Sequence, residues 1–145
     1  MDWKEISAEE AEKHPAYGFG GGLHVVYAIV ILWSLHSLYI VFLDSGYKLT
    51  QSYGYENYTM ADFTSFIQFI LALPFLYLAP KLHPTMPSVA LSLFSVNWAI
   101  WFTFGMITPR AIPMSVLVSV VTLGILLYLL SSARVNVTYR NRVKA

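Results

Sequence analysis

The sequence contains no cysteine and little charge, and both absences narrow what the chain can do. Without thiols it has no disulfide, no thiolate metal site and no cysteine nucleophile. Only 12% of its 145 residues are charged, against about 25% in soluble domains. The nine basic and eight acidic side chains give a net charge of +1, so no basic face is available to meet nucleic acid.

Four long apolar stretches, none of which contains Asp, Glu, Lys or Arg, make up most of the chain. The first, Leu23 to Leu43, has 21 residues, enough for a helix to cross a hydrocarbon core of roughly 30 Å at about 1.5 Å per residue. The sequence therefore predicts a single-domain, all-α membrane protein with four transmembrane helices in an antiparallel up-down bundle. The predicted spans are residues 23–43, 63–80, 88–108 and 114–132.

A polar segment, residues 1–22, precedes the spans, and a basic tail, residues 133–145, follows them. Ser7 and Glu10 have the spacing of a capping box, which predicts a short helix in the first segment. With four spans, the two termini and the second turn share one side of the membrane. That side has seven of the nine basic residues: Lys4, Lys13, Lys81, Arg134, Arg140, Arg142 and Lys144. Because basic residues favour the cytoplasmic side, we expect both termini to be cytoplasmic, with Lys48 and Arg110 outside.

Polar residues recur within the spans, where they are costly and normally face protein or water. Asp62, Ser65 and Gln68 form one stripe on the second span, with Asp62 at the expected N-cap. Asn97 lies deep in the third span and could hydrogen-bond Gln68 across a helix pair, or line a cavity. Two interpretations stay open: a polar path that begins at Asp62, or a helix cap combined with hydrogen bonds between helices.

Histidines and small residues suggest little further chemistry. His24 and His83 are weak candidates for a haem site at the cytoplasmic end, and His36 is an interfacial or hydrogen-bonded histidine; we predict no metal and no cofactor. Small residues recur at helical spacing, which is typical of a packing seam between membrane helices. We expect the third and fourth spans to meet along these residues, which are Ser88, Ser92, Ser95, Ala99, Thr103, Ser115, Ser119 and Thr122.

The basic tail has two compatible interpretations. Arg134, Arg140, Arg142 and Lys144 could bind anionic lipid headgroups, at about 1 kcal/mol each near the surface. They could also do no more than set the orientation of the chain.

Two stretches at the ends of the spans carry a family resemblance. Gly20-Gly21-Gly22-Leu23 resembles the Gly-Gly-Trp-Leu start of the bacterial inner-membrane domain-of-unknown-function family 2569 (YdgK-like). The ending, Ser132-Ala133-Arg134-Val135 followed by Thr138-Tyr139, is similar to that family's Ser-Lys-Arg-Val…Thr-Phe. The resemblance implies a multi-pass protein of the bacterial inner (plasma) membrane, and it transfers no catalytic residue.

No phosphate loop, nucleophile elbow or pair of intramembrane carboxylates occurs in the sequence, so we expect no enzyme. The leading hypothesis is an accessory or interaction subunit of a larger membrane assembly, in contact with the lipid bilayer and with a protein partner or a second copy of itself. The alternative is a small oligomeric transporter or channel whose polar path runs through Asp62, Gln68 and Asn97.

Overall fold

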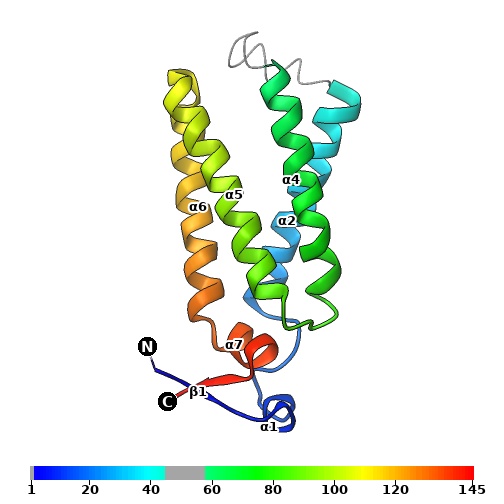
Figure 1. Cartoon of the computed structure of the whole chain (residues 1–145), viewed down its shortest axis with the longest axis vertical. Coiled ribbons are helices and arrows are strands. Elements are labelled where there is room, and N and C mark those ends of the chain that lie inside the picture. Colours follow the sequence, from blue (N-terminus) through cyan, green and yellow to red (C-terminus); the bar gives the residue numbers. More distant parts are fainter. Residues whose placement is uncertain (1, 45–57) are drawn as a thin grey trace.

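The structure, a computed structural model, describes residues 2–44 and 58–145, without the side chains of residues 43–44 and 58–62. Four long helices dominate it (Figure 1). They are α2 (Gly22–Tyr39), which a π-helical turn η1 (Ile40–Asp44) extends, α4 (Tyr58–Leu78), α5 (Met86–Ile107) and α6 (Ile112–Ser131). Successive long helices run in opposite directions; α4 packs against α2 and α5, and α5 packs against α6.

Three of the long helices have the length and composition to span a membrane: Gly22–Phe42, Met86–Ile107 and Pro109–Ser131. The described apolar part of α4, Phe63–Leu78, is shorter. Because α4 begins at Tyr58, Asp62 lies inside the helix, and its predicted place at the N-cap is wrong. The side chain of Asp62 lies outside the described residues, as does Lys48.

The two ends of the chain fold together beneath the bundle (Figure 1). The N-terminal part contains the strand β1 (Trp3–Glu5) and the helix α1 (Ala8–Glu12). The capping box predicted from Ser7 and Glu10 is confirmed, and its hydrogen bonds lower the pKa of the Glu10 carboxyl. The tail forms the helix α7 (Ala133–Arg140) and the strand β2 (Arg142–Lys144), which pairs antiparallel with β1. Sequence analysis predicted neither α7 nor the sheet.

Helix α7 is joined to the bundle by buried side chains. Val135 and Tyr139 belong to the main hydrophobic core. The Tyr139 hydroxyl donates a hydrogen bond of 2.7 Å to the carbonyl oxygen of Ala79, just beyond the end of α4. Burial, more than the nearby Tyr128 and Tyr17, raises the pKa of Tyr139, so the phenol stays protonated and remains a donor.

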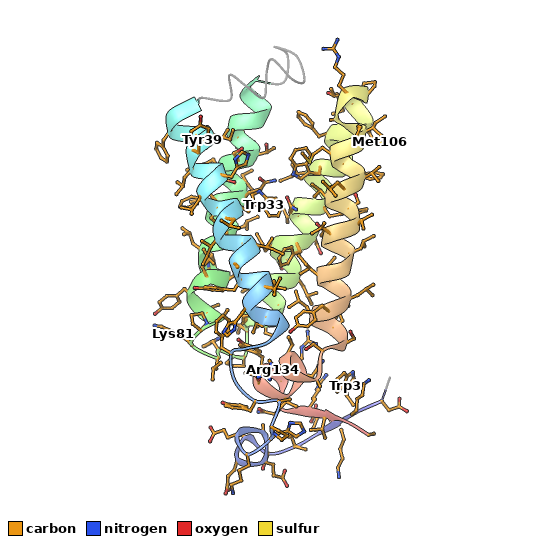
Figure 2. The ribbon with its side chains drawn as sticks, turned by 180° about the vertical axis from the view of Figure 1, so that it is seen from behind. Trp3, Trp33, Tyr39, Lys81, Met106 and Arg134 are labelled. Carbon is orange, nitrogen blue, oxygen red and sulfur yellow. The ribbon has the colours of Figure 1, made fainter. Side chains whose placement is uncertain are left out.

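The glycine-rich stretch before α2 closes around an arginine. The Arg134 guanidinium donates to the carbonyl oxygens of Tyr17 and Gly18, at 3.2 and 3.4 Å, and Figure 2 shows it beside this stretch. Gly21 has φ +57°, and a Cβ built there would lie 3.3 Å from Arg134 Nε. Glycine is therefore needed at this position for both its backbone conformation and its small size.

An aromatic chain fills the core at the end of the bundle near the termini. The ring of Phe19 meets that of Tyr27 edge-on at 5.1 Å, Tyr27 lies 6.1 Å from Phe75, and Phe75 meets Phe94 edge-on at 6.4 Å. Because Phe75 and Phe94 are fully buried, this chain joins α2, α4 and α5 through side chains that exclude water.

The seam between α5 and α6 only partly follows the predicted pattern of small residues. On α6, Ser115 and Thr122 are buried. On α5, every predicted residue is exposed, so that half of the prediction is wrong: Ser88, Ser92, Ser95, Ala99 and Thr103. The buried face of α5 instead contains larger side chains, including Phe94 and Phe104. The close approach depends on Gly105, where an added Cβ would lie 2.7 Å from Ser115.

Gly105 and Gly124 offer a matched test of this seam. We expect Gly105→Ala to destabilise the protein by about 1–3 kcal/mol, because its methyl group overlaps Ser115 and the helices must separate. Gly124 has no neighbouring atom within 4 Å of such a methyl group, so Gly124→Ala should be neutral or stabilising by up to about 1 kcal/mol. Thermal unfolding in detergent, followed by circular dichroism, measures both. Equal effects of the two changes would contradict the packing described for this seam.

Tyr139→Phe tests the attachment of α7. The change removes the donor to Ala79 and should cost about 1–2 kcal/mol, which lowers the unfolding midpoint by several degrees. Tyr77→Phe is the control, because Tyr77 is 61% exposed and its hydroxyl accepts a hydrogen bond from the exposed side chain of Lys81. If Tyr139→Phe unfolds like the wild type, the hydrogen bond does not hold α7 in place.

Candidate functional site

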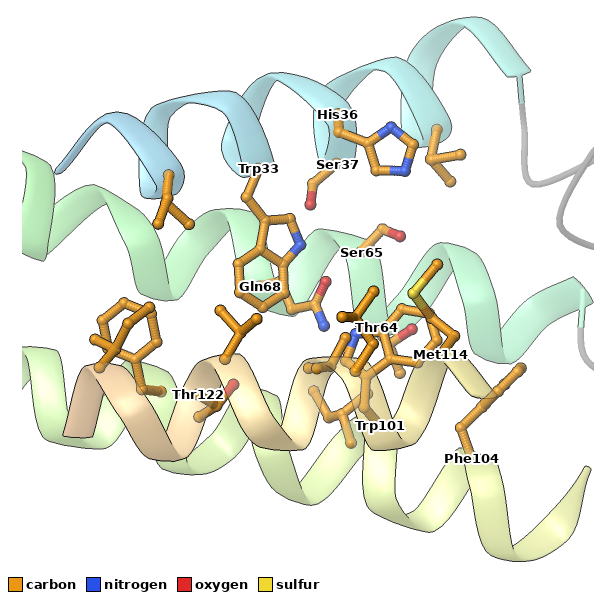
Figure 3. Close-up of a pocket in the computed structure, with 18 of the residues that line it drawn as sticks. Trp33, His36, Ser37, Thr64, Ser65, Gln68, Trp101, Phe104, Met114 and Thr122 are labelled. Atoms are coloured by element: carbon orange, nitrogen blue, oxygen red, sulfur yellow. The ribbon is translucent and has the colours of Figure 1, made fainter. Parts of the chain in front are cut away.

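A cleft of about 690 Å³ lies between the α2/α4 pair and the α5/α6 pair (Figure 3). All four long helices contribute to its walls, which are mostly apolar and aromatic. Polar side chains line it as well, namely those of His36, Ser37, Thr64, Ser65, Gln68 and Thr122. The larger apolar side chains around it include Trp33, Phe94, Trp101, Phe104, Met114 and Val121.

The cleft occupies the half of the bundle farther from the termini, where the two helix pairs diverge (Figure 1). Along α2 and the first residue of η1 its lining runs from Ile29 to Ile40, about 16 Å of helix. Phe94 and Ile125, which both belong to the hydrophobic core, bound it toward the terminal end. The cleft is therefore a recess that ends against packed apolar side chains.

Gln68 and Asn97 meet at the side of the cleft. Gln68 Nε2 donates a hydrogen bond of 2.9 Å to Asn97 Oδ1, which is the contact between helices suggested by the sequence. Asn97 is only 1% exposed. Ser65 lines the cleft with Gln68, so these two members of the predicted stripe share its surface. For Asp62 the structure describes only the position within α4.

Two buried nitrogen donors at this site have no hydrogen-bond partner among the described residues: Asn97 Nδ2 and Trp101 Nε1. Their residues are four positions apart on α5 and so share one face of the helix. Trp101 lines the cleft, whereas Asn97 lines a void of about 10 Å³ behind it. Trp33, Ser37 and Gln68 border both spaces, and Figure 3 shows Gln68 extending from α4 toward Trp101.

The four histidines do not gather at the cleft. His36 lines it, but the ring of His24 packs edge-on against Phe19 at 4.8 Å, and His83 Nδ1 lies 2.8 Å from the Thr85 hydroxyl. Among the side chains that the structure describes, no three of His, Asp or Glu are grouped so that they could hold a metal ion. His24 and His83 thus have ring and hydroxyl neighbours of their own.

The basic residues of the tail lie in the folded terminal end. Besides Arg134, Arg142 pairs with Glu5 at 3.1 Å, and Lys144 stands opposite Trp3 in the sheet. Arg140 donates to Asn136 Oδ1 at 3.2 Å; burial and the nearby Arg142 lower the pKa of its guanidinium. Several of these side chains therefore contact protein groups of the terminal end.

Sequence reasoning found Ser65, Gln68 and Asn97 but missed the two tryptophans that complete the site. A usable signal was present, because Trp33 precedes Ser37 by four residues and Trp101 follows Asn97 by four. Each pair predicts a polar and an aromatic group on one helix face.

The fold and the cleft are those of a helical membrane protein with three candidate membrane-spanning helices. Comparison of the chain with protein-family models, curated proteins and solved structures finds no match.

The hydrogen bond between Gln68 and Asn97 can be tested by replacing each residue with leucine, because the two changes leave different polar atoms without a partner. Gln68→Leu leaves both polar atoms of the fully buried Asn97 without a partner among the described residues. Asn97→Leu leaves the half-buried Gln68 Nε2 without its acceptor, but it also removes a buried donor that has none. We therefore expect Gln68→Leu to cost more stability than Asn97→Leu. The double variant should lose about 0.6–1.7 kcal/mol less than the sum of the two. Unfolding in detergent measures this cycle, and strictly additive losses would contradict the pairing.

Proposed function

We propose that this chain is a non-enzymatic accessory protein of the bacterial inner membrane that holds an apolar, membrane-resident molecule in its cleft. In this proposal α4 is the fourth span and both termini are cytoplasmic. The charge count supports that orientation, since seven of the nine basic residues lie on the termini or the α4–α5 turn. The bacterial inner-membrane location rests on the family resemblance alone.

The observation that carries the proposal is the cleft itself. Its volume of about 690 Å³ falls within the range of roughly 300–1,000 Å³ that is usual for small-molecule sites. Apolar walls with a few polar groups are also usual there, because burial supplies affinity and the polar groups fix orientation. A packed four-helix bundle would bury these side chains against one another instead.

Binding fits the cleft better than transport does. A polar path through Gln68 and Asn97 would need to continue toward the terminal end, but Phe75, Phe94 and Leu129 are fully buried there. Ions or polar solutes would lose their hydration in such a core at a cost of many kcal/mol. Apolar molecules, by contrast, pass directly from the hydrocarbon of the bilayer into an apolar recess.

Filling the cleft tests the proposal. In the double variant Val118→Phe/Val121→Trp, both changes enlarge side chains that line the cleft. The matched control, Val116→Phe/Val120→Trp, makes the same changes on the outer face of α6, where the two valines are 57% and 65% exposed. We expect wild type and control to carry a co-purifying apolar molecule from native membranes, and the cleft-filled variant to carry about ten-fold less.

Mass spectrometry of organic extracts from each purified protein measures this difference, with elution volume and circular dichroism as checks of folding. If no apolar molecule co-purifies with the wild type, or if the folded cleft-filled variant retains the same amount, the cleft is not a binding site and the proposal fails.

A further inference from the structure

The hydrogen-bond donors at the cleft indicate which kind of molecule could bind there. Among the described residues, two buried side-chain nitrogens lack a partner, and both are donors: Trp101 Nε1 at the cleft and Asn97 Nδ2 just behind it. A buried donor without an acceptor costs about 1–3 kcal/mol, and the cost in a membrane is no smaller because the hydrocarbon supplies no acceptor. A well-matched occupant would therefore bring acceptor atoms, and an occupant rich in donors would add to the imbalance.

The neighbouring amide strengthens this preference. Gln68 Nε2 already donates to Asn97 Oδ1, and the Gln68 side chain extends toward Trp101 (Figure 3). Nitrogen donors thus converge from α4 and α5 on one level of the cleft. A carbonyl oxygen has two lone pairs and no proton, so it could accept from the indole and from an amide together.

The walls at the same level indicate the shape of the molecule. Trp33 and Trp101 line the cleft there, and Phe94 and Phe104 line it on either side along α5. Flat aromatic side chains pack best against another flat ring, in offset or edge-on contacts worth about 0.5–1.5 kcal/mol beyond burial. An acyl chain fills apolar space equally well but gains nothing from the flat walls.

We propose that the occupant is a lipid-soluble molecule with a flat, carbonyl-bearing ring, as in a quinone, whose oxygen accepts hydrogen bonds from Trp101 Nε1 and from the amide of Gln68, which Asn97 orients from behind the cleft. This inference rests on the proposed function and names the chemical class of the molecule held. The apolar remainder of the ligand lies along the α6 wall, which includes Leu117, Val121 and Ile125.

The test uses the full-length protein in lipid nanodiscs and two probes that differ in the carbonyls. The first is 2,3-dimethoxy-5-methyl-6-decyl-1,4-benzoquinone, and the second is decylbenzene, which has a ring and the same chain but no acceptor. Binding is measured by titration calorimetry for wild type, Trp101→Phe and Asn97→Leu. Trp98→Phe is the matched control, because Trp98 lies on the exposed face of α5 and stacks on Phe102 at 5.2 Å.

We expect Trp101→Phe and Asn97→Leu each to weaken binding of the benzoquinone about ten-fold. Trp101→Phe removes a donor that lines the cleft, and Asn97→Leu removes the acceptor that orients the Gln68 amide. Trp98→Phe should bind the benzoquinone like the wild type. Decylbenzene should bind all four proteins with equal affinity. Asn97→Leu also loses the hydrogen bond from Gln68, so elution volume and circular dichroism check its folding. Trp101→Phe breaks no hydrogen bond of the indole among the described residues and provides a second, independent variant.

Three other outcomes overturn the inference in distinguishable ways. If both probes bind and no variant discriminates between them, the cleft is occupied but its donors do not select a carbonyl. If the benzoquinone fails and a phospholipid ester carbonyl, tested as added dioleoylphosphatidylglycerol, responds to Trp101→Phe, the ring assignment is wrong. If neither probe nor the phospholipid binds, the proposed function fails together with the inference.

Discussion

The rest of the structure depends on the closure of the bundle at the end where both termini lie. There the aromatic chain from Phe19 to Phe94 joins three helices, and α7 adds a further layer beneath them. The Tyr139 hydroxyl and the Arg134 guanidinium attach that layer by donating hydrogen bonds to backbone carbonyl oxygens. Because one end is closed in this way, the helix pairs can diverge at the other without the molecule coming apart.

Where the two helix pairs separate, buried hydrogen-bond donors carry a free-energy cost that contacts among the described residues do not offset. Each helix pair is well packed, and the contact of Gly105 with Ser115 brings α5 and α6 especially close. Between the pairs, the buried donors Asn97 Nδ2 and Trp101 Nε1 have no acceptor within the described part of the chain. Two such groups forfeit about 2–6 kcal/mol, a large share of the roughly 5–15 kcal/mol that stabilises a typical domain. In native proteins nearly all buried polar groups have a partner, which is a protein group or a bound molecule such as water.

The sequence was informative wherever a single physical rule decides the outcome. The lengths of the apolar stretches predicted the long helices, and the spacing of Ser7 and Glu10 predicted the capping box of α1. Gln68 and Asn97 were singled out because they are polar residues within apolar spans, and the structure joins them by a hydrogen bond. The helix start at Tyr58 escaped prediction, because the polar residues before Phe63 carry no apolar signal and only the backbone shows that α4 has already begun.

What the sequence could not show depends on contacts between distant segments. Helix α7 is polar by composition, so nothing local indicates that Val135 and Tyr139 reach the core. The acidic N-terminal segment and the basic tail are complementary in charge, yet their exposed Glu5–Arg142 pair contributes about 0–1 kcal/mol at most. The backbone pairing of β1 with β2 and the burial of α7 must therefore determine that the N-terminal segment and the tail associate with each other. The terminal end, held together in this way, sets the spacing of the two helix pairs. It therefore also sets the width of the cleft before a ligand binds. Preorganisation of this kind favours binding, since the ligand then gains contact energy without having to order the protein around it.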